Sequence, residues 1–189
     1  APLFESGNVT PLSLMDIVNE SGDSIYYLVK DLPERIRDAG LRTVKAFGVK
    51  SRFIHLEFFI LNEDQEGLGK KGDILGLEVN MRPAGGYTPE MYNYSQETDV
   101  YKIWADMVCF DTNTKPIGSH HYCAFYSRRD GRHYKLDDYE ITMKYKDKLK
   151  MWGRIPDALS GAMANQMYVC NFDTEEEMNQ FYQDMAATY

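Results

Sequence analysis

Short apolar runs separated by polar, glycine-bearing breaks predict several β-strands in the first half of the chain. Residues 14–18 and 25–29 are strand-like and flank a Ser-Gly-Asp turn, the pattern of a β-hairpin. Residues 53–61 are dense in aromatic and branched side chains, and residues 73–82 alternate apolar and polar positions after a long polar loop. We therefore expect a second, longer hairpin from these two runs.

Helix signals lie on both sides of this second hairpin. Asp31 followed by an early proline predicts a capped helix over 32–47, and Gly48 is a natural end for it. Thr88 looks like another helix start, and Thr98-Asp99 opens a segment with strongly amphipathic spacing. Its apolar stripe comprises Val100, Ile103, Trp104, Met107 and Val108.

The last third of the chain predicts more strands and a terminal helix. Strands are expected over 117–126, 148–155 and 167–172, and Asp130-Gly131 favours a tight hairpin turn. Thr174 with Glu177 forms the pattern of a capping box before a final amphipathic helix. The fold class is therefore α+β, an antiparallel sheet flanked by helices. We expect two parts, residues 1–113 and a strand-rich extension over 114–189 that ends in the helix and packs on the first part.

Composition excludes several classes of protein. The chain has 189 residues, 43% of them hydrophobic, and a net charge of −8, which fits an ordinary globular protein and disfavours a nucleic-acid partner. No run approaches the length of a membrane-spanning helix, and no basic-then-apolar signal pattern is present, so we expect a soluble, cytoplasmic protein without membrane contact. Cys109, Cys123 and Cys170 are expected to be buried, reduced thiols.

The second hairpin contains the most informative polar residues. Side chains alternate along a strand, so Glu78, Asn80 and Arg82 share one face. A hairpin that folds about residues 67–68 brings Glu57 beside them. Two neighbouring carboxylates repel and need a compensating cation, for which we expect Arg82 close to Glu57 or Glu78. Carboxylate and amide oxygens on rigid strands can bind Mg²⁺, with phosphate oxygens completing its ligands. The alternative explanation for these polar residues is a solvated sheet face with surface ion pairs.

Other chemistry-bearing residues favour structural roles. His120 and His121 are adjacent, and in a strand their rings would point to opposite faces, so packing or surface roles are expected. Trp104 and the tyrosines near it are expected to fill core space rather than stack on a ligand. No serine or cysteine nucleophile motif and no zinc-binding motif occurs, so no nucleophilic residue is assigned.

The run 77–86, Leu-Glu-Val-Asn-Met-Arg-Pro-Ala-Gly-Gly, resembles the signature of the ATP-grasp superfamily, E-[VI]-N-x-R followed by a glycine-bearing loop. The segment 55–58 resembles the earlier metal-ligand strand of that family, and 97–101 resembles the helix start that follows the signature. The resemblance covers roughly residues 10–112. It implies the C-terminal subdomain of the ATP-grasp fold, with residues 114–189 as a small C-terminal extension.

The resemblance also implies roles for individual residues. The metal ligands would be Glu57, Glu78 and Asn80, which would bind Mg²⁺ or Mn²⁺ on the phosphates of ATP. Arg82 would be the catalytic and substrate-binding cation, and it would bind an acyl-phosphate or the acceptor carboxylate. Gly85 and Gly86 would let the backbone approach the substrate, although a turn without a ligand explains them equally well. Charge neutralisation of this kind is what phosphoryl transfer mainly requires.

The family's glycine-rich lid, phosphate-binding lysines and adenine hinge have no counterpart in residues 1–60, so we expect a C-terminal fragment of a longer ligase that is inactive by itself. The parent would activate a small carboxylate with ATP for attack by an amine or similar nucleophile, as carboxylate-amine ligases do. A biotin-carboxylase-like or carbamoyl-phosphate-synthetase-like enzyme is the alternative, and a non-catalytic binding or regulatory module with a vestigial metal site is a third. A homodimer is left open.

Overall fold

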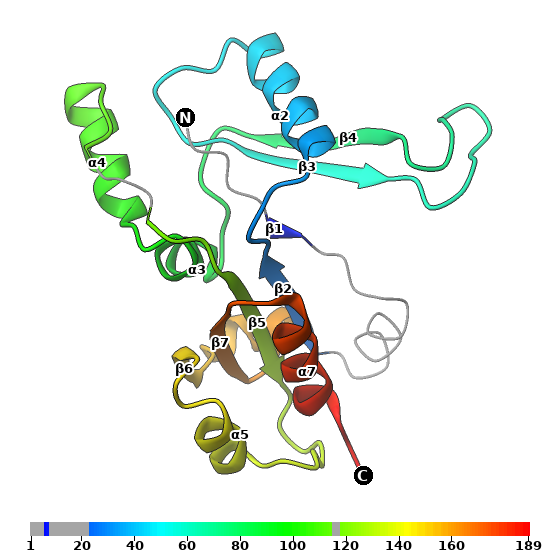
Figure 1. Ribbon diagram of the computed structural model, residues 1–189, viewed down its shortest axis with the longest axis vertical. Helices are drawn as coiled ribbons and strands as arrows, with labels where there is room; N and C mark the ends of the chain where they lie inside the picture. Colours follow the sequence, from blue (N-terminus) through cyan, green and yellow to red (C-terminus); the bar gives the residue numbers. More distant parts are fainter. Residues whose placement is uncertain (1–5, 8–22, 115–117) are drawn as a thin grey trace. The chain divides into compact units, whose positions relative to one another are not determined.

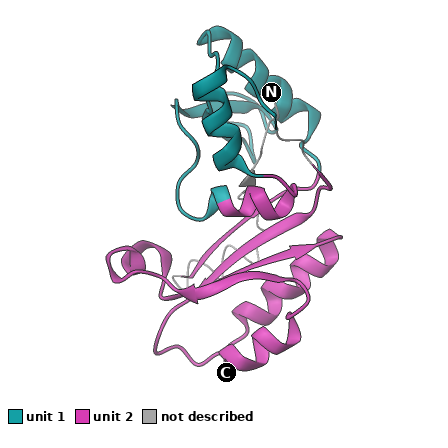
Figure 2. Ribbon diagram, turned by 90° about the vertical axis from the view of Figure 1, so that its left-hand side faces the viewer, with its two compact units in different colours: residues 1–3, 31–89, 99–116 teal, residues 4–30, 90–98, 117–189 magenta. Residues whose placement is uncertain are grey.

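The computed structural model describes residues 6–7, 23–114 and 118–189. It contains two compact units, coloured in Figure 2. One contains residues 31–89 and 99–116, and the other contains 90–98, 117–189 and the strands near the start of the chain. The units alternate along the sequence and do not correspond to one boundary at residue 113. The assignment of a metal-bearing domain to residues 1–113 therefore stays a prediction.

The second unit is built on a five-stranded antiparallel sheet in the order β1-β2-β5-β7-β6 (Figure 1). The strands are β1 (Ser6–Gly7), β2 (Ser24–Leu28), β5 (Tyr122–Arg128), β6 (Leu149–Arg154) and β7 (Gln166–Phe172). The strands predicted over 25–29, 148–155 and 167–172 are confirmed. The predicted strand over 14–18 lies outside the described residues.

The core of this unit is aromatic. Helix α7 (Glu175–Ala186) contributes a buried stripe, and β5 and β7 contribute alternate side chains to the same cluster. Phe181 stands edge-on to Tyr145, with ring centroids 5.0 Å apart, a geometry that aromatic quadrupoles favour. The buried cluster includes Tyr126, Tyr168, Phe172, Met178, Phe181, Tyr182 and Met185.

Arg128 is buried at the end of β5, only 2% exposed. Its guanidinium donates to the carbonyl oxygens of Leu136 at 2.8 Å and Met185 at 3.0 Å, and it lies over the ring of Tyr134. Local sequence does not reveal this burial, because the carbonyl of Met185 comes from a distant segment of the chain. The planar guanidinium of Arg donates to several carbonyl oxygens, which an apolar side chain would leave without a donor.

The residues after β5 also differ from the prediction. Asp130-Gly131 forms a turn but not a hairpin, because β5 pairs with β2 and β7 and the chain continues into α5 (Asp138–Lys144). Asp137 and Glu140 cap α5 reciprocally in a capping box, which the sequence analysis had missed together with α6 (Asp157–Met163).

The N-terminus of α7 follows the prediction more closely. Thr174 accepts from the backbone N–H of Glu177, as expected for a capping residue. The Glu177 carboxylate bonds to the backbone N–H of Asp173 instead of that of Thr174, so the capping box is only half formed.

The first unit contains the hairpin β3 (His55–Ile60) and β4 (Ile74–Asn80) together with α2 (Glu34–Ala46) and α4 (Val100–Phe110). Helix α2 begins after Pro33, without a side-chain cap, so the expected capping by Asp31 is not found. Gly48 has φ +60° just beyond the helix and ends it as predicted. Helix α3 (Thr88–Ser95) begins at the expected Thr88 and lies mostly in the other unit.

Helix α4 starts at the predicted cap, since Asp99 accepts from the backbone N–H of Lys102 at 2.9 Å. Its apolar stripe is only half buried. Val100 and Ile103 are buried, whereas Val108 is 63% exposed. Trp104 is partly exposed and stacks on Phe53 at the edge of the hairpin, so the core role expected for it is met only in part.

The three cysteines are free. Cys123 and Cys170 are buried as expected, and burial raises the pKa of each thiol. Cys109 is exposed, so the expectation that all three are buried is wrong for this one. In the part of the chain that the structure describes, no helix is long and apolar enough to span a membrane.

The buried guanidinium of Arg128 gives a prediction about stability. Arg128→Lys keeps the charge but loses the planar guanidinium that donates to several carbonyl oxygens. We therefore expect the free energy of unfolding, measured in urea, to fall by about 2–4 kcal/mol. The matched control is Arg154→Lys, which alters an exposed pair with Asp130 and should cost far less. Equal losses in the two variants would contradict this account.

Candidate metal and phosphate site

The two strands of the hairpin bring the predicted metal ligands together. Glu57 lies directly opposite Glu78, and His55 lies opposite Asn80. Directly opposed residues share a face of an antiparallel pair, with Cβ atoms about 4.5–5.5 Å apart. The expected fold about residues 67–68 is therefore confirmed, and so is the expected placement of these residues on one face.

The loop between the strands is closed by its own carboxylates and backbone. Asp64 accepts from the backbone N–H of Lys71 at 2.9 Å and from the ammonium of Lys70 at 3.0 Å. Leu61 and Asp73 pair at the base of the loop through a backbone bond of 3.0 Å. These bonds hold the two strands in the register that opposes Glu57 and Glu78.

A β-bulge lies immediately after Glu57, between Glu57 and Phe58. Beyond it the pairing resumes one residue out of step, with Phe58 opposite Gly76. Bulges bend a strand and redirect its side chains, and they often lie beside functional positions. The bulge therefore marks the point on the hairpin where the opposed carboxylates lie.

The basic side chain beside this pair is not the one expected. Arg82 donates from Nη1 to the carbonyl oxygen of Pro83 at 3.0 Å, and among the described residues no ion pair joins it to Glu57 or Glu78. The expected proximity of Arg82 is therefore wrong for this structure. Instead, Nε2 of His55 lies 3.4 Å from Oε1 of Glu57.

Two buried polar atoms on this face have no hydrogen-bond partner among the residues that the structure describes. They are Nδ1 of His55 and Nδ2 of Asn80, on residues that lie opposite each other. Unsatisfied buried groups are uncommon and often indicate a missing ion, water or functional contact. A rotation of the Asn80 amide would present its oxygen here instead, so the donor set of two carboxylates and one amide fits a hard cation such as Mg²⁺. No group of three or more acidic, histidine or cysteine side chains within the described ranges is arranged as a metal cage.

The loop after β4 contains the two glycines assigned to substrate approach. Gly86 has φ +63°, a conformation that favours glycine over other residues. A Cβ added at Gly85 would meet no atom within 4 Å, so folding alone does not require glycine there. Open space over Gly85 is compatible with close approach of a ligand.

The histidine pair of the sequence lies elsewhere. His120 and His121 precede β5 and contact different groups, the carbonyl oxygen of Lys30 and the carboxylate of Asp173. The neighbouring Lys148, and then His121, lower the pKa of Asp173 by bonding to its charged form. Both histidines thus have the surface roles expected for them.

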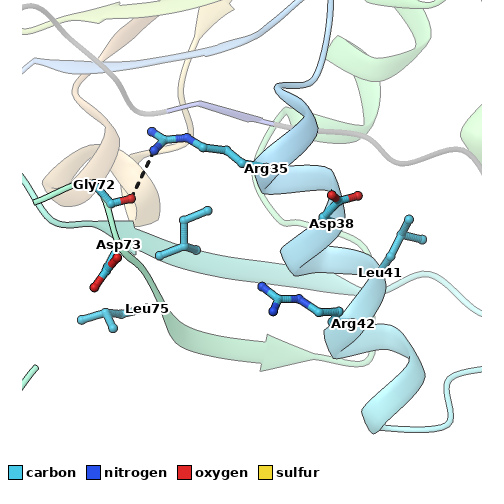
Figure 3. Close-up of a pocket in the computed structure, with 8 residues that line it drawn as sticks. Arg35, Asp38, Leu41, Arg42, Gly72, Asp73 and Leu75 are labelled. Carbon is cyan, nitrogen blue, oxygen red and sulfur yellow. Dashed lines mark hydrogen bonds between the residues drawn. The ribbon is translucent and has the colours of Figure 1, made fainter. Parts of the chain in front are cut away.

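A groove of about 810 Å³ lies between α2 and the start of β4, shown in Figure 3. Arg35 reaches across it and donates to the carbonyl oxygen of Gly72 at 3.1 Å, which joins the helix to the hairpin loop. Leu41, Arg42 and Leu75 also line the groove. The sequence analysis had not singled out any of these residues.

Comparison with solved structures finds ligases with the same fold. The chain is similar to phosphoribosylglycinamide synthetase from Anaerococcus prevotii, with a TM-score of 0.57 and 11% identity, over 85% of this chain and 43% of that chain. It is also similar to L-amino acid ligase from Bacillus licheniformis, with a TM-score of 0.58 and 18% identity, over 85% of this chain and 41% of that one. The chain thus spans less than half the length of either ligase.

The expected α+β class is confirmed, and the chain shares its fold with part of each of these two ligases. At these identities the similarity concerns the fold alone. No family model matches the sequence, and a search of curated proteins finds no similar one.

The opposed carboxylates lead to a prediction about metal binding. Without metal, the free energy of unfolding of Glu78→Gln should equal that of the wild type or exceed it by up to about 1 kcal/mol. The variant removes the repulsion between two directly opposed charges. Saturating Mg²⁺ or Mn²⁺ should raise the melting temperature of the wild type but not that of this variant, since only the intact site gains by binding.

The control for this melting experiment is Glu66→Gln, which removes an equal charge from the exposed loop. This control should respond to metal as the wild type does. A metal response that survives in Glu78→Gln, or that disappears in Glu66→Gln as well, would refute a site at Glu78.

Proposed function

We propose that this chain is the metal- and phosphate-binding half of an ATP-dependent ligase that joins a small carboxylate to an amine or a similar nucleophile. The observation that carries the proposal is the direct opposition of Glu57 and Glu78, with Asn80 two residues further on the same face, within a fold shared with two ligases. One neighbour is an L-amino acid ligase, which supports the carboxylate-amine type.

The proposed roles follow from the chemistry of phosphoryl transfer. Glu57, Glu78 and Asn80 would hold Mg²⁺ or Mn²⁺, which supplies charge neutralisation on the phosphates of ATP. Arg82 would bind the acyl-phosphate or the acceptor carboxylate. Only its Nη1 has a partner among the described residues, so most of its five N–H donors remain for a substrate. Gly85 and Gly86 would allow the backbone to approach that substrate.

The reaction proposed for the complete enzyme has two steps. A carboxylate oxygen attacks the γ-phosphorus of ATP and ADP leaves, which forms the acyl-phosphate. The amine then attacks the acyl carbon, phosphate leaves and the amine loses a proton, which forms the amide. The chain's own residues contribute binding, orientation and charge compensation to these steps, the terms that dominate phosphoryl transfer.

Two alternatives remain, and hydroxylamine trapping separates them. An enzyme extended upstream to full length should release phosphate from ATP when given its carboxylate, and hydroxylamine should capture the acyl-phosphate as a hydroxamate. A biotin-carboxylase-like or carbamoyl-phosphate-synthetase-like enzyme would instead require bicarbonate for ATP turnover. A non-catalytic module would show neither activity and would tolerate Glu78→Gln without losing its partner.

The short span of the chain predicts weak binding of nucleotide. Since it covers 43% and 41% of the two ligases, most contacts to adenine would come from residues outside it. Calorimetry of the 189-residue chain with Mg-ATP should give a Kd weaker than about 1 mM, because few contacts offset the entropy lost on association. ATP hydrolysis by the chain alone should be absent. Micromolar binding would show that the chain contains a complete nucleotide site and would refute the half-site proposal.

A further inference from the structure

The polar face of the hairpin contains a histidine that the proposed ligand set does not include. His55 lies two residues before Glu57 on β3 and on the same face. Its Nε2 is 3.4 Å from Oε1 of Glu57, with the two side chains 22% and 39% exposed. The distance allows a charge-assisted hydrogen bond after a small adjustment.

We propose that His55 is a positioning residue, whose Nε2–H holds one carboxylate oxygen of Glu57 so that the other oxygen would remain available, together with Glu78, to bind a divalent cation. The inference rests on the proposed function, because it assigns a role in the metal site of that function. It adds to the ligand set a residue that orients a ligand without binding the metal.

The surroundings of Glu57 favour His55 for this task. In the described part of the chain, His55 is the one basic side chain within ion-pair distance of Glu57, and Arg82 is directed to Pro83. An unrestrained carboxylate opposite a second carboxylate would turn away from it, because like charges repel. A hydrogen bond from His55 fixes the carboxylate in place before any metal arrives.

The burial of one ring nitrogen of His55 also selects its tautomer. Nδ1 is buried and has no hydrogen-bond partner within the described ranges. A proton on Nδ1 would be a buried, unsatisfied donor, which is costly, whereas a proton on Nε2 is used by Glu57. A proton on Nε2 therefore fits the site, because from this position the ring can donate to Glu57.

Partners of this kind matter for metal affinity in general. Residues that orient metal-binding carboxylates and histidines typically change affinity by about 10–100-fold when they are replaced. We therefore expect His55→Phe to weaken Mn²⁺ binding to the 189-residue chain by about 10-fold or more. His55→Gln should retain most of the affinity, since its amide N–H can donate from a similar position.

The first test is titration of Mn²⁺ into the wild type and the variants, followed by electron paramagnetic resonance. The matched control is His133→Phe, which replaces an exposed histidine of the other unit and should bind Mn²⁺ like the wild type. Wild-type affinity in His55→Phe would overturn the positioning role but leave the proposed function standing. A wild-type chain that binds no Mn²⁺ would overturn both.

The second test needs no metal and remains decisive if His55→Phe does not fold. Long-range ¹H–¹⁵N correlation spectra of the metal-free chain should show His55 with its proton on Nε2, and Glu57→Ala should weaken that preference by removing the acceptor. His133 supplies the internal control, because its tautomer should not respond to Glu57→Ala. A proton on Nδ1 of His55 in the wild type, or a preference unchanged in Glu57→Ala, would overturn the proposal.

Discussion

The register of the β3–β4 hairpin is the constraint on which the candidate site depends. A slip of one residue in this pairing would move Glu78 and Asn80 to the face opposite Glu57, because side chains alternate along each strand. The loop bonds of Asp64 and Asp73 act against such a slip. The register is therefore set by polar contacts at the far end of the hairpin from the site.

Helix α2 provides a second restraint on the same hairpin. A two-stranded ribbon is marginally stable in water by itself and needs a packing partner. Gly40 of α2 comes close to Leu56, since a Cβ placed on this glycine would lie 3.8 Å from the leucine side chain. Leu56 is opposite Val79 and faces away from the carboxylates. Packing of the half-buried apolar face near α2 therefore leaves the polar face available for ligands.

The two units differ in how well their buried polar groups are paired. The larger sheet buries an aromatic core together with the Arg128 guanidinium, which donates to several carbonyl oxygens. The hairpin instead keeps two opposed carboxylates and two unsatisfied buried atoms, an arrangement that does not favour stability by itself. Local conflicts of this kind are expected where residues are retained for binding.

Alternation and capping are local properties of the chain, so the sequence alone predicted the strands β2 to β7, the starts of α3, α4 and α7, and the shared face of Glu57, Glu78 and Asn80. It could not determine which basic side chain accompanies Glu57, since the direction of the Arg82 side chain depends on the loop after β4. Nor could it determine that Arg128 is buried, because that depends on carbonyls from distant segments that meet only in the folded sheet. These features required the tertiary structure, for long-range contacts decide where a charged side chain finds its partners.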